Sequence, residues 1–148
     1  MKWVTWENVG VDRMASAWLI RKFIDPQAEF IFVPIGQKPL PEGAESFDIP
    51  GVRYSHHRGH CTFYTLLKEY KLKDPTLAQI AQIVDEADVV QEAAVEPAAP
   101  GLDLICRGLR RASKDDWEAL ARGALVYDAL YAELSAGNIP NEPNTQGD

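Results

Sequence analysis

Residues 2–33 read KWVTWENVGVDRMASAWLIRKFIDPQAEFIFV, and this segment predicts a strand, a helix and a second strand. Val, Trp and Thr alternate loosely through residues 2–6, as is typical of a strand. Apolar side chains then recur at helical spacing until Asp25-Pro26, where the helix ends because proline cannot continue its backbone hydrogen bonds. A second strand is expected at residues 29–33. This βαβ order predicts a parallel pair joined by a right-handed crossover.

The remainder of the chain predicts two more short strands followed by helices. The strands are expected at residues 46–49 and 52–56, on either side of a Pro-Gly turn. Further helices are predicted to begin near Cys61, at Asp74-Pro75, near Gly101 and at a Ser113 cap. The expected fold class is therefore α/β (α+β): a small N-terminal, mostly parallel sheet with a βαβ start, covered by a mainly helical C-terminal half.

The composition predicts one soluble domain. The chain has 148 residues, a net charge of -7 and 46% hydrophobic residues. We expect a single domain over residues 1–135 and a disordered tail over residues 136–148. The acidic charge argues against direct binding of nucleic acid, and no apolar run approaches the ~20 residues that span a membrane. The start lacks a signal-peptide pattern, so we expect a cytoplasmic protein; the sequence leaves a homodimer open.

The two cysteines are expected to be unpaired. Cys61 and Cys106 fall in different predicted elements, and nothing in the sequence brings them together. Reduced thiols are the usual state of cysteines in a cytoplasmic protein.

All three histidines and one of the two cysteines lie in residues 54–63, YSHHRGHCTF. His56 ends a predicted strand, whereas His60 and Cys61 open the next helix. The free N–H groups and positive dipole of a helix start would lower the pKa of a thiol and favour an anion. The spacing matches no standard zinc motif. The alternative interpretation is a polar turn that binds nothing.

Aspartates on apolar helix faces are further candidates. Asp88 continues the apolar stripe of the third predicted helix, Asp85 flanks the same side, and Asp128 lies on the apolar face of the last helix. A buried carboxylate must be paired, hydrogen-bonded or metal-bound, because burying it alone is costly. Alternatively, Asp88 reaches water at the helix end and Asp128 binds an arginine. Asp12 and Arg13 follow the first strand, at the sheet edge where ligands gather.

These residues suggest a site for a metal ion or a small anionic ligand. His56, Asp88 and Asp85 form a mixed N/O set that suits a divalent ion such as Zn, Mn or Fe. Cys61 is expected as a fourth ligand or an anion-facing thiol, and Arg13, Asp12 and Asp128 as further ligand-binding groups. Because ligation needs neutral imidazole, binding is expected to weaken below about pH 6.

Several motifs together resemble one family. They are DRMASAWLIRKFIDPQAEFIFV (residues 12–33), Phe47-Asp48, H-x4-C-T-F (residues 56–63), Asp88, Gly101-Leu102 and YDALY (residues 127–131). Over roughly residues 1–135 the chain resembles the chromate-resistance domain, which is the C-terminal domain of ChrB-type proteins. The resemblance implies a role in chromate response. The resemblance implies Glu in many relatives at the position of Tyr64 and His at that of Asp85. If those residues serve a metal in the family, the site is altered or lost in this chain.

Three functions are compatible with these observations. The first is a domain that binds a metal ion or small oxyanion and is linked to chromate response or resistance. The second is a metal-dependent enzyme, a hydrolase or redox protein, that uses His56 and Asp88. The third is an interaction module without a ligand. The sequence has no nucleophile–base pair, phosphate-binding loop or dinucleotide fingerprint, which favours the first function over the second.

Overall fold

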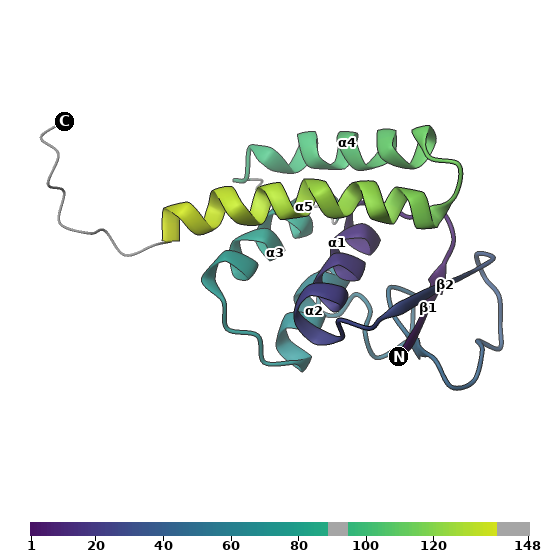
Figure 1. The fold of residues 1–148 in the computed structure, drawn as a ribbon. Coiled ribbons are helices and arrows are strands. Elements are labelled where there is room, and N and C mark those ends of the chain that lie inside the picture. The colour runs from purple at the N-terminus through teal and green to yellow at the C-terminus, as the bar shows by residue number, and fades with distance from the viewer. Residues whose placement is uncertain (89–94, 139–148) are drawn as a thin grey trace, which may run out of the picture.

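The computed structural model describes residues 1–88 and 95–138. Its elements in chain order are β1 (Lys2–Trp6), α1 (Val11–Leu19), the π-helical turn η1 (Ile20–Ile24), β2 (Glu29–Val33), β3 (Glu45–Ser46), α2 (Thr62–Glu69), α3 (Pro75–Asp88), α4 (Ala98–Ala112) and α5 (Asp116–Asn138). Figure 1 shows the strands and their long loops on one side of the molecule and the helices gathered on the other. The predicted fold class is confirmed.

The sheet is small and wholly parallel. Its strand order is β2-β1-β3, with Trp3 opposite Phe30 on one side and Glu45 on the other. The central strand β1 is buried at Trp3, Val4 and Thr5. The two strands predicted at residues 2–6 and 29–33, and the helix between them, are confirmed.

The strand predicted at residues 52–56 is wrong. β3 pairs with β1 over only two residues, and the next segment meets it at a single bridge between Phe47 and Tyr54. The chain then turns back in a tight hairpin, where His57 and His60 exchange backbone hydrogen bonds of 3.2 and 3.0 Å. Both residues between them have positive φ, 53° at Arg58 and 79° at Gly59, as in a type I′ turn. The short β3 offers no edge long enough for another strand.

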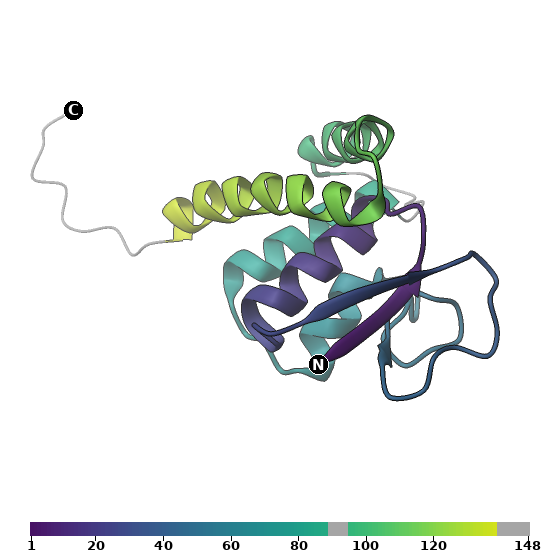
Figure 2. The same cartoon turned by 45° about the vertical axis from the view of Figure 1, so that its right-hand side comes forward.

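Helix α1 is the centre of the helical half. It packs against α2, α3, α4 and α5, and Figure 2 shows α4 and α5 on the side of the helical half away from α2. Trp18 of α1 is 5% exposed, and its ring lies 6.5 Å from that of Phe63 and 5.9 Å from that of Tyr127. No helix among the described residues is both long enough and apolar enough to cross a membrane.

Two of the predicted helix boundaries are corrected. Ser113 does not cap α5; its hydroxyl donates to a carbonyl of α4, and Asp115 instead accepts the N–H of Glu118 at 2.9 Å. α5 runs on through residues 136–138, which were predicted as tail. The remainder of that predicted tail, residues 139–148, lies outside the described residues.

The prediction of unpaired cysteines is confirmed. Cys61 and Cys106 are both buried and both free. Cys61 lies just before α2 and Cys106 in α4, so each thiol belongs to a different part of the core.

Replacing Trp18 by alanine should lower the free energy of unfolding by about 3–5 kcal/mol, because a large buried aromatic side chain leaves a cavity. Trp117→Ala is the matched control, since Trp117 is 55% exposed and should cost clearly less. Urea denaturation of the two variants checks this. Equal losses would contradict the assignment of Trp18 to the core.

Candidate functional site

The start of α2 is capped by an aspartate from another helix. Asp12 of α1 is 2% exposed, and its carboxylate accepts the N–H groups of Thr62 at 2.8 Å and Phe63 at 3.0 Å. Cys61, at the N-cap position, makes no side-chain capping bond. The first N–H groups of a helix have no partner within it, so Asp12 satisfies two of them and meets the positive end of the helix dipole.

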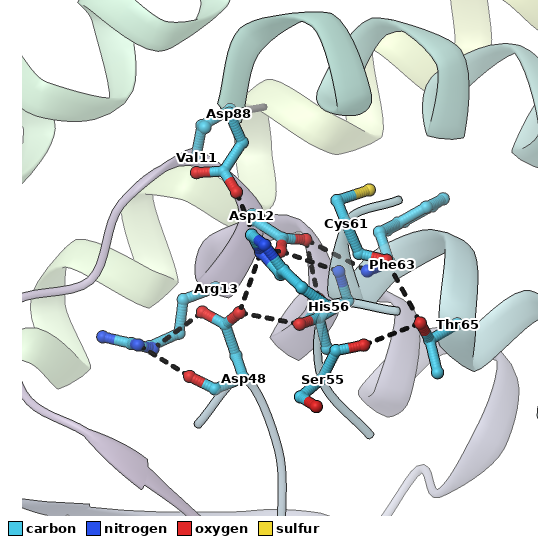
Figure 3. Close-up of polar contacts among 12 residues, drawn as sticks. Val11, Asp12, Arg13, Asp48, Ser55, His56, Cys61, Phe63, Thr65 and Asp88 are labelled. Atoms are coloured by element: carbon cyan, nitrogen blue, oxygen red, sulfur yellow. Dashed lines mark hydrogen bonds and ion pairs between the residues drawn. The ribbon is translucent and has the colours of Figure 1, made fainter. Parts of the chain in front are cut away.

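His56 brings three carboxylates to one nitrogen atom. Its Nε2 lies 2.9 Å from Asp12 Oδ2, 3.0 Å from Asp88 Oδ2 and 3.7 Å from Asp48 Oδ1. Figure 3 shows these acids approaching His56 from α1, from the end of α3 and from the loop after β3. A single N–H cannot satisfy three carboxylates, so the arrangement concentrates more negative charge than its proton balances.

Asp48 is held in place by Arg13 and Thr62. The backbone of Asp48 has a φ of 53°, in the left-handed region that Asp tolerates better than most residues. Arg13 Nε forms an ion pair with Oδ2 at 3.0 Å (Figure 3). The hydroxyl of Thr62 donates to Oδ1 at 2.7 Å. Arg13 also donates to the carbonyls of Trp6, Glu7 and Asp48. It therefore fastens the Asp48 loop to the end of β1.

The crowded charges shift three pKa values. Burial, together with the nearby charge of Asp12, raises the pKa of Asp48 to about 8. Hydrogen bonds to Asp12 and Asp88 raise the pKa of His56 to about 10. Burial opposes the ionisation of Asp12, but the bonds from His56 and from two backbone N–H groups outweigh it and lower its pKa. With these pKa values both His56 and Asp48 carry a proton at neutral pH in the metal-free protein, and His56 acts as the counter-ion of Asp12.

The donor atoms have the chemistry of a metal site. Ligand atoms of Asp12, Asp48 and His56 lie within 4.8 Å of one another, and Asp88 reaches the same imidazole nitrogen. One nitrogen and up to three carboxylate oxygens form a set that suits Zn, Mn or Fe, with the harder ions favoured by the oxygens. A surface cavity of about 430 Å³, lined by His56, Asp48, Asp88 and Arg13, adjoins the group. The same atoms are therefore within reach of a small molecule.

The structure brings together part of the predicted site and separates the rest. His56, Asp88 and Asp12 meet as described, but Asp85 does not join them. Asp85 accepts the N–H of Cys61 at 2.7 Å and binds His60 Nδ1 at 2.7 Å. Asp85 and Asp88 are three residues apart on α3, yet their carboxylates serve different partners.

The expectations for Cys61 and Asp128 are corrected. Cys61 is fully buried, and burial followed by the nearby charge of Asp12 raises the pKa of its thiol, where a lowered pKa had been predicted. The neutral thiol is part of the core. Asp128 accepts the indole N–H of Trp18 at 2.9 Å and pairs with Lys22 at 3.2 Å, so it lies apart from His56.

Sequence reasoning missed Asp48 and Thr62 as members of the site. Asp48 lies in the segment predicted as a strand at residues 46–49, beside a Pro-Gly turn, and nothing in that pattern indicates a site. Thr62 had been taken as an ordinary helix start. No local pattern reveals that a loop aspartate crosses to the N-terminus of a later helix.

Comparison with known proteins places the chain in a family. A model of the family described as "ChrB, C-terminal domain" matches residues 3–134. The chain belongs to this family. It is 33% identical over 136 residues to Protein ChrB from Cupriavidus metallidurans, covering 91% of this chain and 41% of that protein. No solved structure matches the chain. His56 and the three aspartates that face it, Asp12, Asp48 and Asp88, all lie inside the matched segment.

The metal-free domain should become less stable as the pH rises from about 7 to 10. The pKa of His56 rises from 6.5 to about 10 on folding, so its contribution is fully present below pH 6.5 and is lost as the pH passes 10. Asp48, whose pKa is raised from 3.8 to about 8, acts in the same direction, but its contribution is already lost by the time the pH has passed 8. Urea denaturation at several pH values, in protein stripped of metal, measures it.

His56→Gln should flatten this pH dependence, whereas His57→Gln should retain it. Among the described residues, the imidazole of His57 bonds only to the hydroxyl of Ser55 and to the carbonyl of Arg53. If both variants fall in stability as the wild type does, the aspartates do not hold the proton on His56.

Proposed function

We propose that this domain binds a divalent metal ion through His56, Asp88, Asp48 and Asp12, and that this site serves a role in chromate response or resistance. The observation that supports the proposal is the meeting of one imidazole with three carboxylates beside a cavity. A cation at this point would replace the proton on His56 and balance the carboxylates. The chain spans 41% of Protein ChrB, so the chromate link of the whole protein is part of this proposal.

A metal ion fits the site better than a bare oxyanion. Three carboxylates face two cationic groups, His56 and Arg13, so the group is acidic when all five are ionised. Arg13, the natural anchor for an oxyanion, already donates to three carbonyls and pairs with Asp48. An incoming anion would have to displace these bonds and approach the aspartates. A small oxyanion is better accommodated in the cavity as a partner of the bound cation.

Protons should compete with the ion over a wide pH range. The sequence alone predicts weakening below about pH 6, from an ordinary histidine. The pKa of His56 is raised to about 10, so metal binding must displace a proton throughout neutral pH. The fraction of neutral imidazole falls about tenfold for each pH unit below that pKa. Binding should therefore strengthen as the pH rises from 6 toward 10.

A metal-dependent enzyme is the second candidate function. The cavity of about 430 Å³ beside His56 and Asp88 favours it, because a substrate or water could reach the same donors. Turnover assays with hydrolase and redox substrates would distinguish it from a binding domain. The third candidate, an interaction module without a ligand, predicts no bound metal at all.

Element analysis of the purified protein tests the proposal directly. The wild type and His57→Ala should each retain about one metal ion per chain after incubation with Zn²⁺ or Mn²⁺, and the ion should raise the melting temperature. His56→Ala should neither bind the ion nor show the rise in melting temperature, because it removes the only nitrogen donor of the set.

Retention of metal by both histidine variants would contradict the proposal. So would a wild type that takes up no ion and gains no thermal stability. His57→Ala is a matched control, since it removes a neighbouring imidazole of similar exposure that makes no contact with the aspartates.

A further inference from the structure

A second cavity lies between α2 and α3, apart from the site around His56. Its volume is about 290 Å³, near the lower end of the range for small-molecule pockets. It shares no lining residue with the cavity beside His56. Part of its wall is apolar, from Leu67, Leu72 and Ala81, and the rest carries lysine and aromatic side chains together with Gln82 and Asp85.

Three lysines gather on this cavity in an acidic protein. Lys68, Lys71 and Lys73 line it, while the whole chain has a net charge of -7. Within residues 1–88 and 95–138, none of the three lies within ion-pair distance of a carboxylate. The ammonium of Lys68 lies 5.3 Å from the ring centre of Tyr64. Lysines that converge without acidic partners form a positive wall for an anion.

His60 stands at the edge of the same cavity in a fixed orientation. Its Nδ1 binds Asp85 Oδ2 at 2.7 Å, and its ring stacks on Tyr64 with 3.8 Å between ring centres. Asp85 is 4% exposed, and its other oxygen accepts the N–H of Cys61. The buried Asp85 carboxylate thus fixes the orientation of the His60 imidazole through its Nδ1 atom. His60 Nε2 has no hydrogen-bond partner in the described part of the chain, so it is free for a ligand.

We propose that this cavity is a second ligand site, which takes a small organic anion: a carboxylate or phosphate group on an apolar or aromatic body. The lysine ammonium groups would hold the anionic group, and Tyr64 and the leucines would cover the body. His60 Nε2 would offer the one directional polar contact. This inference is independent of metal binding, because none of its residues belongs to the group around His56.

An NMR titration with benzoate tests the proposal. The protein is first stripped of metal, so that a carboxylate cannot bind through an ion at His56. Benzoate should shift the amide signals of α2 and α3 saturably at millimolar concentrations or below, whereas inorganic phosphate, which lacks an apolar body, should bind clearly more weakly. Shifts that do not saturate, or that centre on other elements, would overturn the proposal.

Charge-neutralising variants identify the residues that act. Lys71→Gln and Lys73→Gln should each weaken benzoate binding by up to about fivefold, as loss of one exposed charge pair does. Lys114→Gln makes the same charge change at an exposed position between α4 and α5 and should leave the affinity unchanged. Equal affinities for all three variants would overturn the proposal. All are surface changes, so folding should be retained in each.

Discussion

The buried hydrogen bonds between the helices of this domain centre on the N-terminus of α2. Three successive backbone N–H groups there, those of Cys61, Thr62 and Phe63, are bound by aspartates from two other helices. Asp12 comes from α1 and Asp85 from α3, and both are almost fully buried. A buried N–H without a partner is costly, and so is a buried carboxylate. The N–H groups of α2 and the aspartate carboxylates satisfy one another, and these hydrogen bonds hold α1, α2 and α3 together.

Asp12 and Asp85 also bind two different histidines, so the histidine-rich segment contributes to two separate groups of side chains. Asp12 faces His56 and, through it, Asp48 and Asp88. Asp85 faces His60 and the lysine-lined cavity between α2 and α3. The group around His56 gathers three carboxylates, and we propose it as a cation site, whereas the cavity beside His60 carries three lysines, and we propose it as an anion site. The two histidines are close in sequence, but Asp12 and Asp85 come from different helices and hold them beside different neighbours.

The two positions at which the family resemblance implies a difference both lie beside His60. Tyr64 and Asp85 were expected to alter a metal site, but both line the cavity beside His60. Tyr64 stacks on that imidazole and Asp85 binds its Nδ1. The aspartates and the histidine of the proposed metal site stand apart from them. The differences that the resemblance implies thus lie at the second cavity in this chain, and within its described part neither Tyr64 nor Asp85 contacts His56 through an ion pair or a ring stack.

The sequence by itself determined the βαβ start, the four later helices, the burial of Trp18 and the free state of both cysteines. These properties follow from local periodicity, from proline positions and from the spacing of cysteines, which act within one element. His56 and Asp88 were predicted to lie together as metal ligands; the structure places them 3.0 Å apart, and their binding of a metal stays a prediction. Only the tertiary structure decided that Asp12 caps α2, that Asp48 crosses from a loop, and that Asp85 turns to His60. It also decided that the Cys61 thiol is neutral, since burial there outweighs the helix dipole. Helical spacing shows which face a side chain occupies, but the partner across that face depends on how distant elements pack.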